Sequence, residues 1–363
     1  MYSVFQPWDP LKVCVVGKSY PPEFYSWIKN SSTRRRFEQL AEETEQDYQI
    51  LVNLLQVRFG IEVLRPQLPD DLGRLNVHGS WMQPPVCPRD YFIMIHDQLW
   101  VPKVPNKIHS DRAFIRQGNL DREQFDKVNQ LQLHARLSCY KDIFRQVHNQ
   151  GNRVQTTDLD FINGCFVSRI GNNLYFATQE YSEDKDCLLQ IINTHFPDTH
   201  NQIVNAGGHG DATYCPVTPG LIISLRDVPS YAETFPGWEV VYLPPSNYEH
   251  MREFQASMRL NRGRWHIPGF DQDIILINTV ETYFQDWVGN VSETVFDVNI
   301  LVIDHKNIIV SSHNDQVEEA CARHGIEVHV SPFRHRYFWD AGIHCITNDL
   351  NREGTIQKIT SND

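Results

Sequence analysis

The chain has 363 residues, of which 41% are hydrophobic, and its formal net charge at pH 7 is −12. This composition is that of a globular protein with one large core or two modest ones. The acidic balance argues against a general nucleic-acid or anionic-membrane surface, although net charge alone assigns no partner. No stretch approaches the roughly 18 apolar residues of a membrane span, and the N-terminal segment lacks the basic and apolar regions of a secretory signal. We therefore expect a soluble, cytoplasmic protein without nucleic-acid or membrane partners.

The eight cysteines are scattered, without Cys-x-x-Cys spacing or crowding in a short segment. This distribution is unlike a zinc ribbon or a disulfide framework, so we expect reduced thiols. No GxGxxG or GxxxxGK[ST] motif occurs, and a nucleotide cofactor is therefore not expected. The positions are Cys14, Cys87, Cys139, Cys165, Cys187, Cys215, Cys321 and Cys345.

A helical pattern that ends near Gly or Asn and leads into a short β-branched run recurs about five times. In the first copy the apolar residues from Phe37 to Leu55 follow i, i+3, i+4 spacing, and Gly60 can end the helix in a left-handed conformation. In the last copy Asp315 and Glu318 have the spacing of a capping box, and Gly325 ends the helix. The five β-branched runs are residues 60–64, 151–155, 201–205, 237–241 and 325–329.

A second pattern, two apolar runs around a tight polar turn, is typical of β-hairpins. It occurs at residues 91–103, 165–179 and 299–312. Each repeated unit is thus predicted to contain a hairpin, a helix and a strand, in that order. Such units can close into a propeller-like ring, although similar short repeats also occur in ordinary α/β proteins. We expect an α/β fold and, since no disordered linker is evident, a single domain over 1–363.

Long insertions separate the repeats at 103–151 and at about 246–289. The second is rich in aromatic residues and mixed in charge. It is interpreted first as a packed surface excursion and second as an active-site lid.

Four separated segments carry residues that can do chemistry together: CPRDYF at 87–92, DLDFINGC at 158–165, GGHGDATYC at 207–215 and FWDAGIHCITNDLNREGTIQ at 338–357. With them, nearly the whole chain resembles the arginine amidinotransferases, the family that includes glycine and inosamine-phosphate amidinotransferases. The resemblance implies a five-bladed α/β propeller of repeated ββαβ units, a pentein-like fold with a central active site. It also implies transfer of the amidino group of L-arginine to an amine, with release of ornithine and without a cofactor.

The resemblance also implies a role for each residue. Cys345 matches the nucleophile, and His209 matches the general acid and base. Asp160 matches the carboxylate that orients this histidine, and we prefer it to Asp158 because Phe161-Ile162 follows it. Asp90 and Asp211 match the two carboxylates that grip the guanidinium. The chemistry needs all of these, because the guanidinium carbon is resonance-stabilised and the departing amine must be protonated.

The chain departs from the family pattern at three places. Asp340-Ala341 stands where the family commonly has Gly-Gly, which puts a carboxylate close to the nucleophile. Gly208 stands where the vertebrate glycine enzyme has Met. Val228 stands where that enzyme has an Arg, and Arg226 lies two positions earlier. We therefore expect Arg226 and Asp340 to contact the substrates, and an acceptor amine other than glycine.

Other functions stay open at this point. Water in place of the amine would give an arginine deiminase or dihydrolase, and loss of turnover would leave a guanidinium-binding protein. A metal site built from His209, Asp211, His344 and Cys345 lacks HExxH, Cys-x-x-Cys or paired-His spacing, so none is expected. The expected partners are small molecules and a second copy of the chain.

Overall fold

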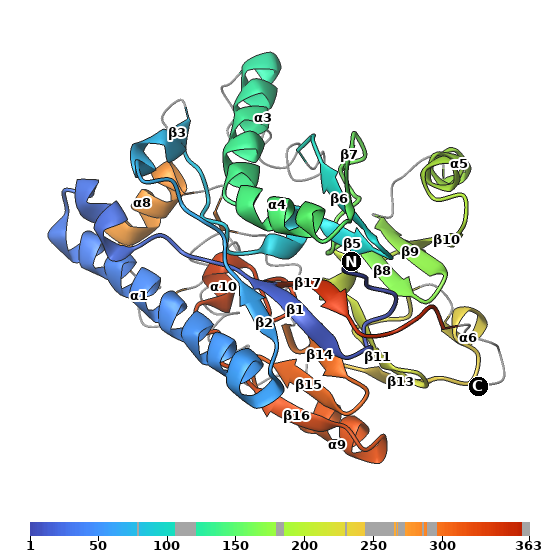
Figure 1. Ribbon diagram of the computed structural model, residues 1–363. Coiled ribbons are helices and arrows are strands. Elements are labelled where there is room, and N and C mark those ends of the chain that lie inside the picture. Colours follow the sequence, from blue (N-terminus) through green and yellow to red (C-terminus); the bar gives the residue numbers. More distant parts are fainter. Residues whose placement is uncertain are drawn as a thin grey trace.

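Within the described residues, five three-stranded sheets share one design. In each, two antiparallel strands lie side by side and a third strand adds in parallel orientation. The computed structural model describes residues 1–77, 80–105, 121–178, 185–228, 231–243, 265, 267, 273–284, 287–288 and 296–357. Figure 1 shows the sheets gathered at the centre, with α1, α4, α5 and α9 toward the outside.

The sheets take the following strands. One joins β5 (Ile93–Ile95), β6 (Gln98–Pro102) and β7 (Arg153–Thr157). The next joins β8 (Val167–Ile170), β9 (Asn173–Thr178) and β10 (His200–Asn205). Another joins β11 (Tyr214–Thr218), β12 (Leu221–Ser224) and β13 (Glu239–Tyr242). A fourth joins β14 (Leu301–Asp304), β15 (Asn307–Val310) and β16 (Glu327–Val330). The last joins β17 (Thr347–Arg352), β1 (Leu11–Val16) and β2 (Glu62–Leu64), and β3 (Asn76–Val77) pairs separately with β4 (Ser80–Trp81).

The helices connect and cover these sheets. The longer ones are α1 (Ser31–Asn53), α3 (Arg122–Ser138), α4 (Lys141–Asn149), α5 (Lys185–His195), α8 (Ile274–Tyr283) and α9 (Asp315–Arg323). Two short helices are α6 (Tyr231–Thr234) and α10 (Arg336–Trp339). Among the described residues, no helix is long and apolar enough to cross a membrane.

The structure confirms that the two sequence patterns mark repeated sheet units. Each of the five β-branched runs overlaps the third, parallel strand of a sheet, namely β2, β7, β10, β13 and β16. A helix precedes each of these strands. The three predicted hairpins are β5–β6, β8–β9 and β14–β15. The α/β class follows directly from this alternation.

The two ends of the chain build one sheet together. β17 pairs antiparallel with β1, and Thr347 lies opposite Val16. The register places Cys345 two residues before the first residue of β17. This pairing, which the sequence patterns did not predict, fixes the C-terminal segment against the N-terminal strand.

The helix ends follow the predicted chemistry with one exception. Gly60 and Gly325 have φ of 66° and 68°, the left-handed conformation that glycine adopts without a steric penalty. The capping residue of α9, however, is Asn314, whose side chain accepts from the backbone N–H groups of Gln316 and Val317. Asp315 is the first helical residue, so the predicted capping box at Asp315 was wrong by one position.

The described parts of the two insertions are packed. The first contains α3 and α4, while residues 106–120 lie outside the described residues. Much of the second insertion also lies outside them. Its described helix α8 leads to Phe284, whose ring centroid is 4.9 Å from that of Phe37 on α1. Trp287 stacks on Trp339 at 6.0 Å, just before Asp340. This part of the insertion therefore belongs to the core that supports the C-terminal segment.

Candidate active site

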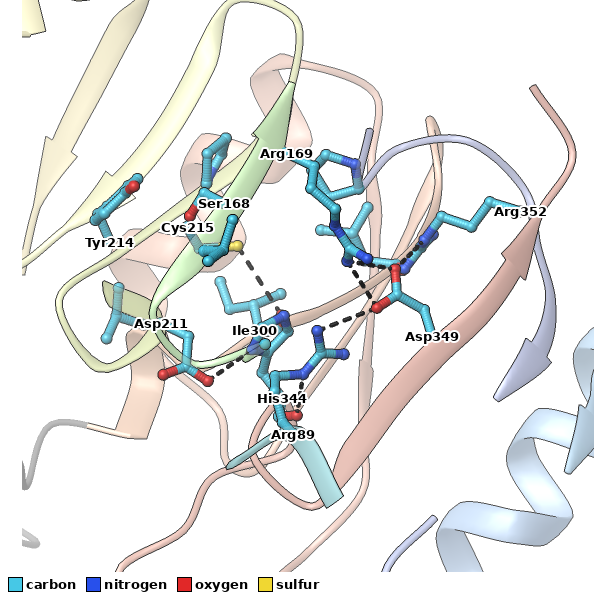
Figure 2. Close-up of a pocket in the computed structure, with 16 residues that line it drawn as sticks. Arg89, Ser168, Arg169, Asp211, Tyr214, Cys215, Ile300, His344, Asp349 and Arg352 are labelled. Carbon is cyan, nitrogen blue, oxygen red and sulfur yellow. Dashed lines mark hydrogen bonds and ion pairs between the residues drawn. The ribbon is translucent and has the colours of Figure 1, made fainter. Parts of the chain in front are cut away.

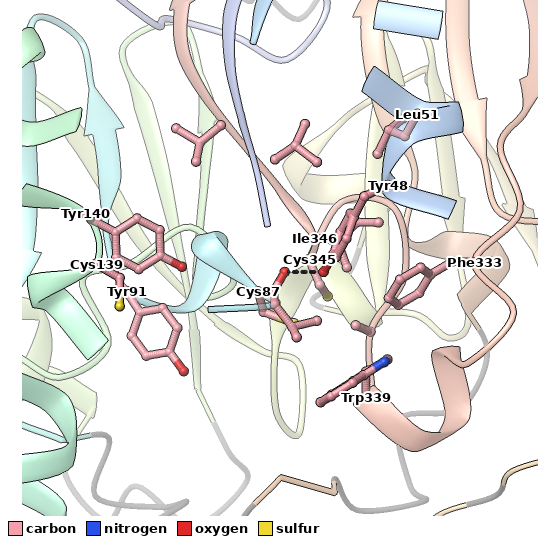
Figure 3. Packing of buried hydrophobic residues seen from close by; sticks show 14 of the residues in the cluster. Tyr48, Leu51, Cys87, Tyr91, Cys139, Tyr140, Phe333, Trp339, Cys345 and Ile346 are labelled. Atoms are coloured by element: carbon pink, nitrogen blue, oxygen red, sulfur yellow. Dashed lines mark hydrogen bonds between the residues drawn. The ribbon is translucent and has the colours of Figure 1, made fainter. Parts of the chain in front are cut away.

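Cys345 lies in the turn between α10 and β17, where it is only 5% exposed. Figure 3 shows it within the same hydrophobic cluster as Cys87 and Trp339. Asn299 holds it on two sides, because the Asn299 Oδ1 accepts from the Cys345 N–H at 3.0 Å and the Asn299 Nδ2 donates to Sγ at 3.0 Å. The thiol itself donates to Asp211 Oδ2 at 3.5 Å. The sulfur is therefore fixed in position beside a carboxylate.

The surroundings of Cys345 oppose its ionisation in the free protein. Burial raises the pKa of the Cys345 thiol well above its usual value, and the neighbouring acidic groups Asp211, Cys87 and Asp90 raise it further. A thiol with these neighbours is protonated at neutral pH. A bound cation would reverse this effect, since it would neutralise the carboxylates that face the sulfur.

Asp211 is the central acid of the site. It lies in the short helix Gly210–Ala212 and is 8% exposed. Burial would raise the pKa of Asp211, but the hydrogen bond from His344, the nearby imidazoles of His344 and His209 and the charge of Arg89 keep it below its usual value. Within the described residues, its Oδ1 has no hydrogen-bond partner. Asp211 is thus an ionised carboxylate with one oxygen available to a ligand.

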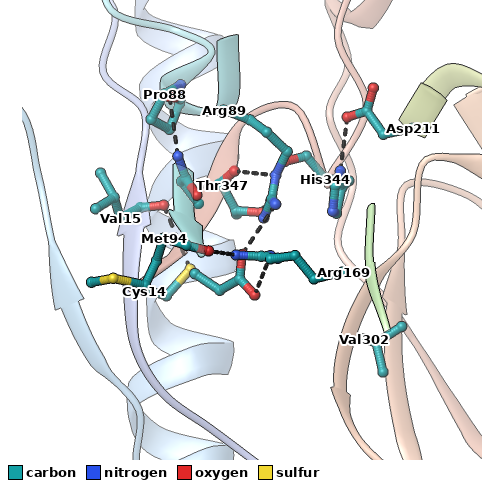
Figure 4. A network of polar contacts seen from close by, with 12 residues as sticks. Cys14, Val15, Pro88, Arg89, Met94, Arg169, Asp211, Val302, His344 and Thr347 are labelled. Carbon is teal, nitrogen blue, oxygen red and sulfur yellow. Dashed lines mark hydrogen bonds and ion pairs between the residues drawn. The ribbon is translucent and has the colours of Figure 1, made fainter. Parts of the chain in front are cut away.

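His344 connects the nucleophile to Asp211. Its Nδ1 lies 2.7 Å from Asp211 Oδ2, and because an ionised carboxylate can only accept, the imidazole carries a proton on Nδ1. Arg89 supports the backbone here, since its Nε donates to the carbonyls of His344 and Thr347 at 2.8 and 2.9 Å (Figure 4). Burial, with the nearby Arg89 charge, lowers the pKa of His344 to about 4. His344 is therefore neutral at pH 7.

This lowered pKa predicts how stability depends on pH. An unfolded histidine has its ordinary pKa of about 6.5, so between pH 6.5 and 4 the unfolded chain binds more protons than the folded one. Stability should fall as the pH falls through this window. We expect the free energy of unfolding of His344→Asn to depend less on pH between 6.5 and 4 than that of the wild type, as measured by urea denaturation. His313→Asn, at an exposed histidine, should keep the wild-type slope. An unchanged slope in His344→Asn would contradict the assignment.

A second cluster joins Asp90, Cys165 and His209. One ligand atom from each lies within 4.8 Å of the others. His209 also packs edge-on against Phe166, with ring centroids 4.9 Å apart. The Cys165 thiol donates to Asn163 Oδ1 at 2.9 Å. The structure thus brings the predicted guanidinium ligand Asp90 to the predicted general base His209.

Among the described residues, Asp90, Cys165 and His209 are also the group whose ligand atoms lie close enough together to hold a metal ion. Carboxylate, thiolate and imidazole are all zinc ligands. The four-residue set considered from the sequence, which combines His209 with Asp211, His344 and Cys345, does not form such a group within the described part of the chain. Two members of the observed cluster, Asp90 and His209, are also the residues that the family resemblance assigns to substrate and to proton transfer.

Asp160 lies in the turn after β7, which ends at Thr157. Its backbone carbonyl accepts from Asn163 Nδ2 at 3.1 Å, and this connects it to the loop that carries Cys165. Asp158 instead forms an exposed ion pair with Lys103 at 3.2 Å. Asp158 and Asp160 both follow the strand. The surface position of Asp158 favours Asp160 as the functional residue of the two.

Arg226 and Asp340 lie at the edges of this region. Arg226 donates through Nη2 to the carbonyl of Ala206, next to the loop that leads to His209. Asp340 ends α10 with a φ of 52°, a left-handed conformation that is uncommon for a residue other than glycine. Its negative charge contributes to the raised pKa of Cys87. Asp340 is therefore held by a constrained backbone turn where its charge acts on the Cys87 thiol.

Sequence reasoning missed Asn299, whose two contacts with Cys345 position the predicted nucleophile. Gly342 makes room for it: a Cβ on Gly342 would lie 2.5 Å from the Cβ of Asn299. We expect Gly342→Ala to displace Asn299 and to lower turnover, on the order of 10²-fold for a shift of about 1 Å. Steady-state kinetics would test this, with Gly73→Ala as the control because its Cβ would approach only the Asp71 side chain, at 3.0 Å. Wild-type turnover in Gly342→Ala would contradict the role of Asn299.

Comparisons with known proteins agree with the motifs. No family model matches the chain. It is 27% identical over 156 residues to mitochondrial glycine amidinotransferase of Xenopus tropicalis, which is 42% of this chain and 29% of that relative. It is 25% identical over 152 residues to the Gallus gallus enzyme, 41% of this chain and 28% of the relative. The chain thus matches less than a third of the length of these curated relatives.

Solved structures extend the likeness to nearly the whole chain. An amidinotransferase of saxitoxin biosynthesis from Microseira wollei superposes with a TM-score of 0.63 and 14% identity, over 99% of both chains. Inosamine-phosphate amidinotransferase from Streptomyces griseus superposes with a TM-score of 0.61 and 16% identity, over 98% of both. The N-terminal domain of a cyanobacterial arginine dihydrolase has a TM-score of 0.50 at 10% identity, over 94% of this chain and 98% of that one.

The chain shares the α/β fold of these amidinotransferases and of the dihydrolase domain. The predicted resemblance to the arginine amidinotransferases is confirmed, in sequence over part of the chain and in fold over nearly all of it.

Proposed function

We propose that this protein is an amidinotransferase that takes the amidino group of L-arginine onto Cys345 and passes it to an amine, with release of ornithine. One observation carries the proposal: the buried Cys345 thiol lies 3.5 Å from Asp211, a carboxylate with an available oxygen. A planar cation that carries several N–H donors is the ligand that suits such a carboxylate.

In the first step the guanidinium binds between Asp90 and Asp211. Its positive charge offsets the two carboxylates that raise the pKa of Cys345, so the thiol releases its proton to solvent as substrate binds and the thiolate forms. The amide of Asn299 donates to the sulfur and stabilises its negative charge. The thiolate then attacks the guanidinium carbon, an S–C bond forms and the bond to the ornithine nitrogen breaks.

Proton transfer is assigned to His209. It delivers a proton to the departing nitrogen of ornithine and afterwards removes one from the incoming amine. The amine attacks the same carbon, the S–C bond breaks and the thiolate returns. Asp160 acts as the carboxylate that orients His209 and stabilises its protonated form.

The Asp160 assignment predicts a separation of binding from turnover. Asp160→Asn should lower kcat, because a misoriented imidazole transfers protons poorly, and should leave arginine affinity within about twofold. Asp158→Asn, at the exposed ion pair with Lys103, should match the wild type in both. Calorimetry and steady-state kinetics would measure the two quantities. An Asp160→Asn variant with wild-type kcat would show that Asp160 has no role in the mechanism.

We also propose that the five three-stranded sheets are the five blades of a propeller around the site. Two features support this arrangement. The sheets repeat one strand order, and β17 and β1 from opposite chain ends complete the last of them. Residues from separate sheets or their connections, including Asp90, Asp211 and Cys345, meet at one place.

Hydrolysis is the second candidate, since an arginine dihydrolase shares the fold. Both reactions begin with attack of Cys345 on the guanidinium carbon, but they differ in the bond that breaks first. Transfer expels ornithine and leaves an amidino group on Cys345, whereas hydrolysis expels ammonia, and attack of water on the remaining Cys345 adduct then gives citrulline. Incubating the protein with arginine and a panel of amines, and following ornithine, citrulline and guanidino products, distinguishes them. Amine-dependent guanidino product together with ornithine supports transfer, citrulline or ammonia without it supports hydrolysis, and no product at all leaves a binding protein.

For the acceptor, we propose an amine larger than glycine that does not depend on a carboxylate. Val228 is 1% exposed and apolar, so this position offers no cation for a carboxylate. Arg226 already donates to Ala206, and Asp340 adds negative charge near the thiols. The test compares kcat/KM for glycine and for a diamine of similar length in the wild type, Asp340→Gly and Arg226→Ala. Strong preference for glycine that Arg226→Ala abolishes would identify Arg226 as the carboxylate anchor and reject this acceptor class.

A further inference from the structure

A small cavity is lined by Asp211 and His344, but not by Cys345, Asp90 or His209. Its volume is about 40 Å³, and strands β8, β11, β14 and β17 all contribute to its lining. One water needs roughly 10–15 Å³ of such space, so the cavity has room for one monatomic ion with a water or two. Figure 2 shows the side chains of Arg89, Arg169 and Arg352 converging on the carboxylate of Asp349, and all four residues line the cavity.

The three arginines share a single carboxylate, Asp349. Arg89 Nη1 reaches Asp349 Oδ1 at 3.1 Å, and Arg169 Nη2 reaches both oxygens at 2.8 and 2.9 Å. Arg352 Nε donates to Oδ2 at 2.7 Å. The three guanidinium groups are 1%, 6% and 3% exposed, so water from the surface does not screen them. Figure 4 shows Arg89 and Arg169 converging from two different elements.

The charges that line the cavity do not balance. Three guanidinium groups face two carboxylates, Asp349 and Asp211. His344 also lines the cavity and is neutral at pH 7, since its pKa is lowered to about 4. The lining therefore carries one net positive charge. Another buried carboxylate, Asp9, is not part of the lining and receives a hydrogen bond from Gln6.

One donor in the lining also lacks an acceptor. Within the described residues, the buried Nη2 of Arg89 has no hydrogen-bond partner. Buried charges are expected to be paired, because an unpaired one costs several kcal/mol of desolvation. An anion in the cavity would neutralise the excess positive charge of the lining and accept a hydrogen bond from Arg89 Nη2.

We propose that this cavity is a binding site for one small monovalent anion, with chloride as the physiological ligand. A single charge balances the lining, and a volume of about 40 Å³ has room for a halide with a water or two. The ion would lie behind Asp211, whose other face contacts Cys345. Binding of the anion would therefore change the electrostatic field at Cys345. This binding does not depend on the proposed transferase activity.

The first test measures stability in two salts. Urea unfolding in sodium chloride and in sodium gluconate, at equal ionic strength, separates halide binding from general screening, since gluconate is too large for the cavity. A ligand that binds only the folded state raises stability in proportion to ln(1 + [L]/Kd). We expect the unfolding midpoint to rise with chloride concentration and to stay constant in gluconate. Equal midpoints in the two salts would overturn the proposal.

Two variants and a control locate the effect. Arg169→Met removes the excess charge and should abolish the difference between the salts. Val302→Leu fills part of the cavity while leaving every charge in place, and should weaken the chloride response at least tenfold in apparent affinity. Arg122→Met removes an arginine from an exposed pair with Asp126 and should retain the full response. A full response in Val302→Leu would place the ion elsewhere.

Bromide gives a direct readout that does not depend on whether Arg169→Met folds. Anomalous diffraction from crystals of the wild type grown in bromide should show a peak between Arg89 and Arg169. Peaks at surface positions only would identify an adventitious ion only, and the cavity would then not be a halide site.

Discussion

Replacement of Cys345 by alanine should abolish ornithine release from arginine, with a loss of at least about 10³-fold. The reason is chemical: without the sulfur no S–C bond can form, and the guanidinium carbon is too stabilised by resonance for a bound amine to attack at a comparable rate. Arginine affinity should change little, since Asp90 and Asp211 remain. Coupled detection of ornithine and calorimetry with arginine measure the two effects.

Cys87→Ala is the matched control for this variant. Cys87 belongs to the same hydrophobic cluster, and its pKa is also raised, by burial and then by Asp90 and Asp340. Cys87→Ala should nevertheless release ornithine at a rate close to that of the wild type. The nucleophile would be misassigned if Cys345→Ala kept its activity or if Cys87→Ala lost it completely.

Asp90→Asn should have two opposite effects on the site. Arginine binding should weaken about ten- to a hundred-fold, because a charge-assisted hydrogen bond is worth about 1.5–3 kcal/mol. At the same time the Cys345 thiol should become easier to ionise, since Asp90 is one of the charges that raise its pKa. Alkylation of Cys345 by iodoacetamide in the absence of substrate should therefore be faster in the variant than in the wild type at pH 8.

The two readouts distinguish an electrostatic role from simple damage to the fold. A variant that is only loosened would bind arginine poorly, but all its buried cysteines would react faster. Peptide mapping should show faster alkylation at Cys345 without a matching change at Cys139, which is 1% exposed. Asp158→Asn should leave both arginine affinity and alkylation unchanged. Slower alkylation of Cys345 in Asp90→Asn would contradict the charge arrangement.

The sequence predicted the sheet units because their signals are local. A β-branched run after a helix, or two apolar runs around Gly171, depends on residues within about 15 positions of each other. The pairing of β17 with β1 joins residues more than 300 positions apart and has no local signature. The cap of α9 was displaced by one residue because Asn314 and Asp315 are both good caps, and only the backbone decides between them.

In the candidate site, too, the sequence predicted the residues that stand in local motifs and missed those that act through tertiary contacts. Cys345, His209, Asp211 and Asp90 stand in motifs, and the structure brings them into two adjoining clusters. Asn299, Arg89 and Cys165 were missed. An asparagine that holds a thiol, or an arginine that supports two backbone carbonyls, acts through tertiary contacts that no short pattern records. The sequence also did not predict that three arginines share the carboxylate of Asp349, because these arginines come from three separate segments.

The most direct test of the account is a pulse and chase of the protein with arginine labelled at the guanidino carbon. Intact-mass and peptide analysis after acid quenching should find the labelled amidino group on Cys345, with one equivalent of ornithine released. Addition of an acceptor amine should then move the label from Cys345 into a guanidino product. Label on another residue, or release of the label from Cys345 only as citrulline or urea whatever amine is present, would contradict the proposed transfer.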